Sequence, residues 1–286
     1  MQPVFILNPL AGYAARTRAK LDAYNIPYIT TWNKEDLPAL VKEQVSEGNH
    51  SFIICGGDGA INRFIAACMK LPPWQRKKIS FGVIPCGTCN DLACALGIPE
   101  DFHKALRKAL AGNPKELDLI RVNADHFITG GGLGLPVHAV QEALRRKRTL
   151  PFLYQAIVAN LMLRGYPPLQ GIRIDGKDAK ELMLIAVQNQ SFIGKRFRLA
   201  PSATQADGQM DICSIDLPSS RLGNLIMLLK VLRGTHIRDA TVMTRKTDHV
   251  TISSKSPLWF MGDGELLSED DSFKISILPR AIKVYR

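Results

Sequence analysis

Hydrophobic and polar positions follow two different patterns along the chain, and the change comes near residue 118. Before it, short apolar runs, typical of strands buried in parallel sheets, alternate with stretches in which apolar residues recur at helical spacing. The predicted strands are 4–7, 26–31, 52–55 and 79–84, and the predicted helices are 16–24, 34–47, 60–68, 92–96 and 102–111. This order predicts an N-terminal α/β domain, a doubly wound parallel sheet with helices on both faces.

After residue 118 the regular alternation ends, and short strands separated by turns predict a β-sandwich-type domain with helical insertions. The predicted strands are 119–122, 127–129, 171–174, 182–187, 210–215, 249–253 and 258–260, and the helical insertions are 137–164, broken near Pro151, and 221–233. The last segment, 273–285, alternates as a strand does. The expected domains are therefore 1–118, completed by 273–286, and 119–272.

The predicted helix 221–233 carries an apolar stripe of Leu222, Leu225, Leu229 and Leu232. Such a stripe is more typical of a helix face packed on a protein core than of a face that meets a membrane. We therefore expect these leucines to be buried.

Composition narrows the class of partner. The 286 residues carry a formal net charge of +11, with a sequence pI near 9.5, so anionic partners are favoured: nucleotides, nucleic acid or an anionic membrane surface. No aromatic-studded basic stretch or familiar nucleic-acid motif occurs, so no nucleic-acid partner is expected. No apolar run approaches the ~20 residues of a membrane-spanning helix, and the first residues look like a buried strand rather than a cleavable signal. The six cysteines are expected to be reduced.

The stretch Ser51–Cys68 places a buried strand, a glycine turn and a helix N-terminus in immediate succession. The turn is Gly56-Gly57-Asp58-Gly59. Glycines let a backbone approach a ligand closely, and the first amides of a helix favour an anion. Asp58 among these donors would hold a metal ion or a metal-bound water. The alternative is an ordinary strand-to-helix turn with an acidic cap.

Four later motifs offer further chemistry, each with a simpler alternative. In 85–91 (Pro-x-Gly-Thr-x-Asn-Asp), Thr88 and Asn90 are suited to helix capping and Asp91 to binding a cation. The segment 261–265 is a further candidate to face phosphates, and Asp207 in 199–211 is suited to bind magnesium, but the Asp-Gly pairs in both segments also suit hairpin turns. The glycine-rich run 130–134 follows a strand and suits a flexible domain junction. There is no Walker loop and no protein-kinase signature.

The order of these motifs is more specific than any one of them. They are Asn8-Pro9-x-x-Gly12, Thr31-Trp32, Gly56 to Asn62, Pro85 to Asp91, Asp118, Asn189, Ala200-Pro201, Asp207-Gly208 and Asp263-Gly264-Glu265. In this order the chain resembles the bacterial lipid kinases of the diacylglycerol-kinase catalytic-domain family, relatives of sphingosine kinase and more distantly of NAD kinase. The resemblance spans nearly the whole chain.

The resemblance implies an ATP-dependent lipid kinase that transfers the γ-phosphoryl group to a free hydroxyl of a membrane lipid such as diacylglycerol or phosphatidylglycerol. Residues 1–118 would bind the nucleotide and residues 119–272 the lipid, with ATP between the domains. The residues implied to contact ATP are Thr31, Gly57, Asp58, Gly59, Ala60, Ile61, Asn62, Arg63 and Thr88.

The resemblance also assigns catalytic and metal-binding roles. Glu265 would be the general base for the lipid hydroxyl, and Asp58, Asp91 and Asp118 would organise catalytic magnesium and water. A separate structural magnesium would be bound by Asp207 with the carbonyl oxygens of Thr204 and Gln209. Phosphoryl transfer needs positioning, neutralisation of charge and a base near the nucleophile, so the set is chemically coherent.

Two residues depart from the family pattern, which has threonine at Ala60 and glutamate at Arg63. These departures motivate an alternative, a catalytically silent regulator that binds nucleotide or lipid, and an NAD kinase is a further alternative. A lipid kinase is expected to be cytoplasmic and peripherally attached to an anionic membrane. The sequence leaves open which lipid is phosphorylated and whether the protein forms a homodimer.

Overall fold

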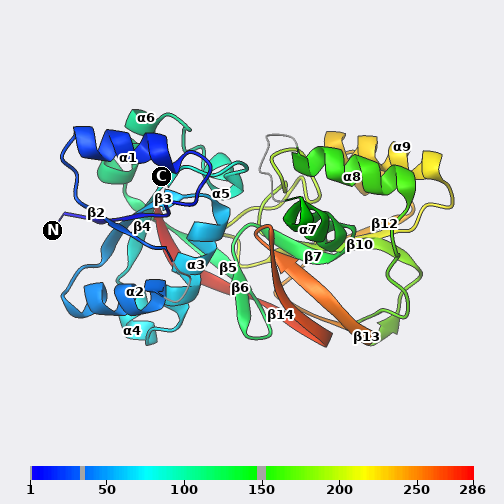
Figure 1. The fold of residues 1–286 in the computed structure, drawn as a ribbon. Helices are drawn as coiled ribbons and strands as arrows, with labels where there is room; N and C mark the ends of the chain where they lie inside the picture. The colour runs from blue at the N-terminus through cyan, green and yellow to red at the C-terminus, as the bar shows by residue number, and fades with distance from the viewer. Residues whose placement is uncertain (1, 33–35, 147–152) are drawn as a thin grey trace. The chain divides into compact units, whose positions relative to one another are not determined.

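The computed structural model describes residues 2–32, 36–146 and 153–286 (Figure 1). The chain divides into two compact units, Met1–Leu117 with Arg280–Arg286 and Asp118–Pro279. The strands β5 (Pro114–Val122) and β14 (Glu265–Tyr285) carry the chain across this division.

The first unit is the predicted doubly wound parallel sheet. Its elements are β1 (Val4–Leu7), α1 (Ala14–Ala23), β2 (Tyr28–Thr30), α2 (Asp36–Ser46), β3 (Ser51–Gly56), α3 (Asp58–Met69), α4 (Pro73–Arg76), β4 (Ser80–Pro85), α5 (Asp91–Ala95) and α6 (Phe102–Ala111). The strand order is β2-β1-β3-β4, with the end of β14 parallel to β4. Figure 1 shows α1 and α6 on one side of this sheet and α2 and α4 on the other.

The sequence accounts for most of this unit. Ends differ from the predicted ones by two residues at most, α4 was not predicted, and the predicted helix start at Lys34 lies outside the described residues. The core forms around three phenylalanines, since the rings of Phe52 and Phe81 each lie 5.2 Å from that of Phe64 on α3. Their full burial fixes α3 against the sheet and thereby the turn that precedes it.

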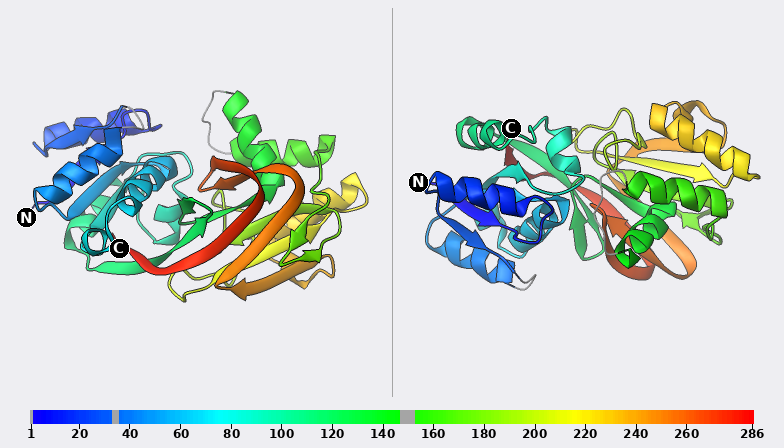
Figure 2. Two further views of the ribbon diagram at one scale, coloured as in Figure 1. Left: turned by 90° about the horizontal axis from the view of Figure 1, so that it is seen from below. Right: turned by 45° about the horizontal axis from the view of Figure 1, so that its top comes forward.

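The second unit is an antiparallel sheet in the order β12-β11-β10-β7-β13-β14, with three helices packed on it (Figures 1 and 2). Besides β5 and β14, its elements are β6 (Asp125–Phe127), β7 (Gly130–Gly134), α7 (Leu135–Arg145), α8 (Leu153–Arg164), β8 (Arg173–Ile174), β9 (Lys177–Asp178), β10 (Leu182–Gln188), β11 (Met210–Asp216), α9 (Arg221–Arg233), the short 3₁₀ helix η1 (His236–Arg238), β12 (Val242–Thr247) and β13 (His249–Gly262).

Strand β10 explains why this unit has two cores. Leu184 and Ala186 belong to the cluster under the helices, whereas Ile185 and Val187 belong to the cluster on the opposite face of the sheet. A strand alternates its side chains between faces, so a strand that is apolar at every position must be covered on both. The predicted helical stretch 137–164 is two helices, and the expected break near Pro151 lies outside the described residues.

The glycine run 130–134 is a buried central strand, so its interpretation as a flexible junction was wrong. As β7 it pairs with β10 on one side and β13 on the other. A Cβ atom at Gly132 would lie 2.0 Å from the carbonyl oxygen of Ile185, and one at Gly131 would lie 2.5 Å from that of Met261. Neighbouring backbones therefore occupy the space where side chains would stand, which only glycine permits.

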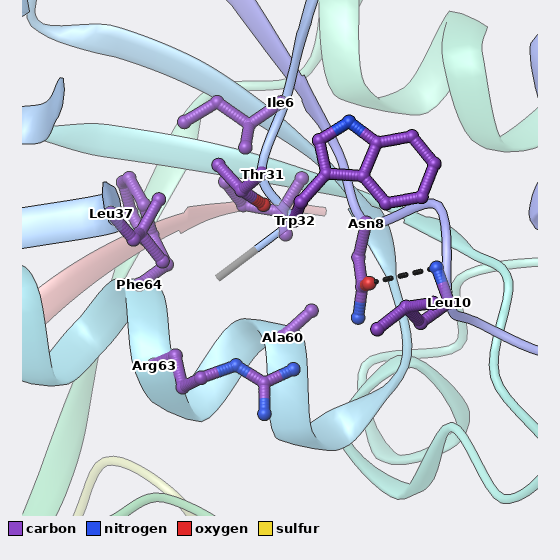
Figure 3. A pocket seen from close by; sticks show the side chains of 10 residues that line it. Ile6, Asn8, Leu10, Thr31, Trp32, Leu37, Ala60, Arg63 and Phe64 are labelled. Atoms are coloured by element: carbon purple, nitrogen blue, oxygen red, sulfur yellow. Dashed lines mark hydrogen bonds between the residues drawn. The ribbon is translucent and has the colours of Figure 1, made fainter. Parts of the chain in front are cut away.

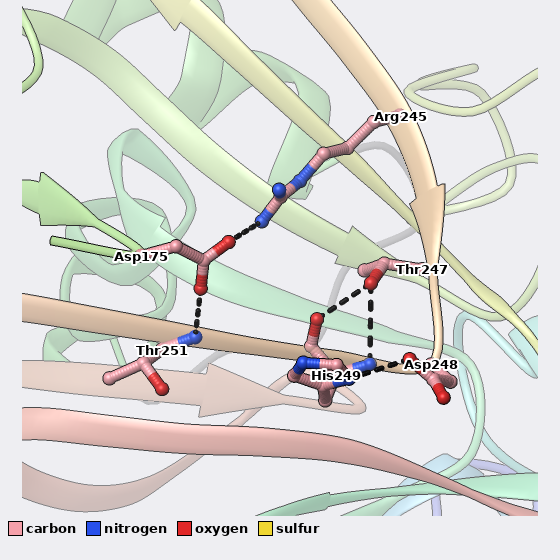
Figure 4. Close-up of polar contacts among 6 residues, drawn as sticks. All are labelled: Asp175, Arg245, Thr247, Asp248, His249 and Thr251. Carbon is pink, nitrogen blue, oxygen red and sulfur yellow. Dashed lines mark hydrogen bonds and ion pairs between the residues drawn. The ribbon is translucent and has the colours of Figure 1, made fainter. Parts of the chain in front are cut away.

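Polar contacts link the β8–β9 turn of the second unit to β12 and β13 (Figure 4). Asp175, in the β8–β9 turn, accepts a hydrogen bond from the Thr251 N–H at 2.8 Å and pairs with Arg245. Burial works to raise the pKa of Asp175, but these two hydrogen bonds together hold it below its usual value. In the turn between β12 and β13, the Asp248 carboxylate lies 2.6 Å from Nδ1 of His249. These contacts join β8, β12 and β13, two of which the sequence predicted.

Three of the four leucines in the stripe of α9 are exposed, so the prediction that the stripe packs on the core was wrong for them, whereas Leu232 packs against the core cluster. Leu222, Leu225 and Leu229 are exposed and Leu232 is half-buried. The helix instead buries its opposite face, formed by Asn224, Met227, Leu228 and Val231.

Candidate functional site

Two glycine turns of the first unit lie against each other at the carboxyl ends of β3 and β4. A Cβ atom at Gly57 would lie 2.8 Å from the Cα of Gly87, and one at Gly87 would lie 2.6 Å from the Cα of Gly57. Contact this close requires both glycines. Gly57 is also the N-cap of α3, so the first turn of a twelve-residue helix begins beside this contact.

Asn90 organises the second turn. Its Oδ1 accepts a hydrogen bond from the Gly87 N–H at 2.9 Å, and its Nδ2 donates one to the Gly87 carbonyl at 2.8 Å, with its own φ at 52°. The Asn90 side chain thus closes its own turn. It makes no capping hydrogen bond to α5, so the predicted capping role of Asn90 was wrong.

Asp58 performs that capping role instead. Its Oδ1 accepts a hydrogen bond from the Leu92 N–H at 3.2 Å, in the first turn of α5. Helix α5 begins at Asp91, so the fold brings Asp58 and Asp91 into one neighbourhood. Asp58 is half-buried and Asp91 is buried. Asp118 belongs to the second unit.

A pocket of about 290 Å³ opens beside the first glycine turn, wholly within the first unit (Figure 3). Its lining comes from the ends of β1, β2 and β3 and from α2 and α3: Ile6, Asn8, Leu10, Thr31, Trp32, Leu37, Ile54, Ala60, Arg63 and Phe64. The inner wall is apolar, and Figure 3 shows the indole of Trp32 and the guanidinium of Arg63 on opposite sides of the opening. A concave, mostly apolar lining with a few polar groups is typical of a small-molecule site.

The residues expected to contact ATP fall into three groups. Thr31, Ala60 and Arg63 line the pocket. Gly57, Asp58, Gly59 and Thr88 lie in the two turns, with Thr88 near Gly12 of the loop after β1. Ile61 and Asn62 are buried and do not line the pocket.

Sequence reasoning missed most of the apolar lining. The sequence indicates Trp32 only as part of the Thr31-Trp32 motif, although an aromatic residue directly after a predicted strand, at the ligand-binding edge of the sheet, is a usable signal. Leu37, Ile54 and Phe64 were read only as apolar positions of α2, β3 and α3, because nothing local separates a pocket wall from a core position.

Asp118 and Asn189 form a buried network in the second unit. Oδ2 of Asp118 accepts a hydrogen bond from the Gly208 N–H at 2.7 Å, which holds the Asp207-Gly208 turn. Nδ2 of Asn189 donates to the carbonyls of Asp118 and Ile128, both at 2.9 Å. Both residues are fully buried, and the two hydrogen bonds of Asn189 are sheltered from water.

Asp263 extends this network. Its carboxylate accepts hydrogen bonds from the N–H groups of Ile128 at 3.0 Å and Thr129 at 2.7 Å, and from the Thr129 hydroxyl at 2.5 Å. Asp263 and Gly264 have φ angles of 50° and 78° and form the two-residue hairpin turn between β13 and β14. Glu265 follows directly, half-buried and opposite Gly262 in the ladder. The hairpin turn offered as the simpler alternative at 261–265 is therefore present, and Asp263 anchors this turn, which Glu265 follows.

Asp207 already has a cation as its partner. Its Oδ2 lies 2.7 Å from Nζ of Lys246, which also lies 3.8 Å from Asp211. Burial works to raise the pKa of Asp207, but hydrogen bonds from Lys246, Thr204 and the Gln209 N–H hold it below its usual value. Magnesium at Asp207 would therefore replace the ammonium group of Lys246, because carboxylate oxygens bind either cation.

No metal cluster of His, Cys, Asp or Glu side chains is formed within residues 2–32, 36–146 and 153–286. Cys86 is buried with its Sγ 3.2 Å from the Thr17 hydroxyl, and burial, partly opposed by Thr17, raises the pKa of its thiol to about 11. Cys86 is thus a core residue whose thiol stays protonated at neutral pH.

Two family models together match most of the chain. The model of the diacylglycerol kinase catalytic domain matches residues 2–122, and that of the YegS C-terminal NAD kinase β-sandwich-like domain matches residues 132–286. A "Probable lipid kinase YegS-like" from Chromohalobacter salexigens is 28% identical over 93% of this chain and 85% of its own length. One of the same name from Yersinia pestis (strain Pestoides F) is 29% identical over 88% and 84%.

Solved structures show the same fold. A crystal structure of a diacylglycerol kinase from Bacillus anthracis str. Sterne matches with a TM-score of 0.73 at 20% identity, covering 99% of this chain and 96% of that one. A second structure from the same organism reaches a TM-score of 0.80 at 21% identity, covering 99% and 94%.

Proposed function

The chain belongs to the lipid kinase family in which a diacylglycerol kinase catalytic domain precedes a YegS C-terminal domain, and we propose that it transfers the γ-phosphoryl group of ATP to a free hydroxyl of a membrane lipid. The observation that supports ATP as the donor is the pocket of the first unit, which lies beside two glycine turns in close contact. In this proposal the adenine ring enters the apolar pocket and the phosphates lie on the amides at the start of α3.

The two departures from the family pattern are compatible with this assignment. Ala60 lies on the pocket wall next to Gly56, where a Cβ would come within 2.5 Å of the Ala60 methyl group. Arg63 adds a cation at the opening, which favours an anionic ligand. We propose that Arg63 faces the phosphates of ATP, so that the charge reversal strengthens attraction to the donor.

Trp32→Ala is expected to raise the Kd for ATP about tenfold, because stacking of a base on an aromatic ring contributes about 1–3 kcal/mol. Isothermal titration calorimetry measures the change. Trp74→Ala is the matched control: Trp74 is 62% exposed, against 60% for Trp32, but lies on α4 outside the pocket, with Lys78 over its ring. Equal ATP affinity in both variants would show that the base binds elsewhere.

The chemistry divides between the two units. The first unit holds ATP, and the second unit supplies Glu265. Glu265 takes the proton from the lipid hydroxyl while the lipid oxygen forms a bond to the γ-phosphorus of ATP and ADP leaves. Magnesium, when bound, neutralises charge on the phosphates. Asp58 and Asp91 are the carboxylates of the first unit suited to hold it or its water, and Asp118 is the corresponding proposal in the second.

We propose that the acyl chain of the lipid enters the second unit at a small apolar cavity of about 30 Å³. Its lining from α8, α9 and neighbouring strands includes Tyr154, Met162, Met183, Phe197 and Leu228. A space this narrow admits an acyl chain only if its lining moves, and two methionines, with flexible unbranched side chains, suit such movement.

The test is a kinase assay with labelled ATP and a panel of diacylglycerol, phosphatidylglycerol and a sphingoid base, with mass detection of the product. The proposal predicts a phosphorylated lipid with ADP release. If the protein binds ATP but turns over no lipid, it is a silent regulator. Phosphorylation of NAD would indicate an NAD kinase.

We also propose that Asp207 supports a structural magnesium in exchange for Lys246. Magnesium is then expected to raise the melting temperature of the wild type by about 2–4 °C, the shift that 1 kcal/mol produces in a domain of this size. Asp207→Ala should lower the melting temperature in magnesium, abolish the magnesium-dependent rise and reduce magnesium-dependent activity. Differential scanning calorimetry with magnesium or chelator measures this, with Asp178→Ala, at an exposed ion pair, as the control. A wild type indifferent to magnesium contradicts the assignment.

Cellular placement completes the proposal. None of the helices in the described residues is long and apolar enough to cross a membrane. We propose a cytoplasmic enzyme held peripherally by the attraction of its +11 charge to an anionic bilayer, without nucleic acid as a partner. Such attraction weakens as salt screens it.

A further inference from the structure

Helix α9 presents an exposed apolar face to solvent. This outer face consists of Leu222, Leu225, Ile226 and Leu229, which are 67%, 37%, 45% and 44% exposed. Because a helix turns about 100° per residue, these four positions share one side, opposite the buried face. A helix with apolar residues on both faces is typically buried on both faces. The outer face of α9 is therefore suited to contact another protein or a membrane.

The outer face is held rigidly in place. Ser220 caps the helix by accepting a hydrogen bond from the Gly223 N–H at 3.0 Å, and Gly234 ends it in the left-handed conformation, with φ at 71°. On the buried side, Nδ2 of Asn224 donates to the carbonyl of Met162 on α8 at 3.2 Å. Leucines on a helix fixed at both ends and along its length cannot turn inward.

The charge around this face suits an anionic partner. Helix α9 carries Arg221, Lys230 and Arg233 and no acidic residue, and α8 carries Arg164 and none either. Three acidic side chains, Glu181, Asp216 and Asp239, line a hollow beside the Ile226 edge of α9.

Two of those three carboxylates face a cation. Lys230 binds Asp239 at 2.5 Å, and Lys180 lies 3.9 Å from Asp216. Leucines flanked by arginines on a helix without acid are typical of a helix that lies in the interface of an anionic bilayer.

The helices α8 and α9 also line the apolar cavity proposed for the lipid chain. Val158 and Met162 of α8 and Leu228 and Val231 of α9 form part of its wall. The helix that would touch the bilayer thus backs directly onto the space that would receive an acyl chain.

We propose that the outer face of α9 inserts into an anionic bilayer, with Arg221 and Arg233 at the level of the lipid headgroups. The inference rests on the proposed function, since a lipid kinase must meet its substrate at a membrane. It adds to that function a defined docking surface and predicts an apolar component of binding that salt does not remove.

The test compares the wild type with Leu222→Gln/Leu225→Gln/Leu229→Gln on vesicles of equal parts phosphatidylglycerol and phosphatidylcholine. Partition into the vesicles should fall about tenfold or more in the triple variant, at low and at high salt, because three leucine side chains no longer leave water. The control is Leu110→Gln, since Leu110 on α6 is 54% exposed and far from α9 in sequence. Should the triple variant fail to fold, Leu222→Glu serves in its place.

Each outcome decides the inference. Unchanged binding of the triple variant overturns it. A wild-type dimer that the triple variant converts to monomer, with vesicle binding unchanged, also overturns it and assigns the face to a second copy. Phosphorylation of a water-soluble short-chain diacylglycerol is measured in parallel. If binding requires the leucines while no lipid is phosphorylated by any variant, the docking surface stands and the proposed function fails.

Discussion

Glu265→Gln is expected to lower kcat for lipid phosphorylation by about 10²–10⁴, the usual contribution of a positioned general base. A lipid alcohol is a poor nucleophile at neutral pH, and glutamine keeps the shape and hydrogen bonding of glutamate but cannot take the proton. The half-buried side chain starts β14, directly after the Asp263-Gly264 turn. Steady-state kinetics on the lipid identified by the panel measure the effect.

Two controls separate loss of the base from other damage. The Kd for ATP should change little in Glu265→Gln, because the phosphates are assigned to the first unit. Asp58→Asn should instead weaken both magnesium-nucleotide binding and turnover. If the Glu265→Gln enzyme retains most of its activity, Glu265 is not the base and the segment serves only as a hairpin.

Asp263→Asn is expected to destabilise the second unit by about 3 kcal/mol, which lowers its melting temperature by about 6–12 °C. The buried carboxylate accepts hydrogen bonds from two N–H groups and a hydroxyl, and an amide would turn its NH₂ group toward one of those donors. Asparagine tolerates the left-handed backbone at this position, so the variant isolates the lost hydrogen bonds from backbone strain.

The comparison with Asp178→Asn makes this result interpretable. Asp178 forms an exposed ion pair with Arg173, so its variant should change stability by less than about 1 kcal/mol. Glu265→Gln, two residues from Asp263, should melt with the wild type. If Asp263→Asn also melts with the wild type, the carboxylate does not anchor the turn.

The sequence was most informative where the signal is local. The predicted bounds of α6 and α9 match the structure, and the run from Phe52 to the glycine turn and α3 lies where its apolar spacing placed it. Each of these elements contains its own hydrophobic period, and the turns between them contain residues with a strong conformational preference.

Contacts distant in sequence were beyond local reasoning. Glycines in β7 have no side chain to show a period, and the need for them comes from carbonyls at Ile185 and Met261. The role of Asp263 depends on donors more than a hundred residues earlier. In α9 both faces are apolar, so the spacing of leucines identified a helix but could not say which face would be buried.

The sheet of the first unit is completed by residues that the ribosome makes after the whole second unit. Val284 pairs with Phe81 of β4, Ile282 and Val284 are buried, and the Tyr285 hydroxyl lies 3.2 Å from that of Ser51. The first unit therefore cannot finish folding while it emerges, and its β4 edge stays unpaired until residues 280–286 arrive. Expression strains with ample chaperone should accordingly improve yield.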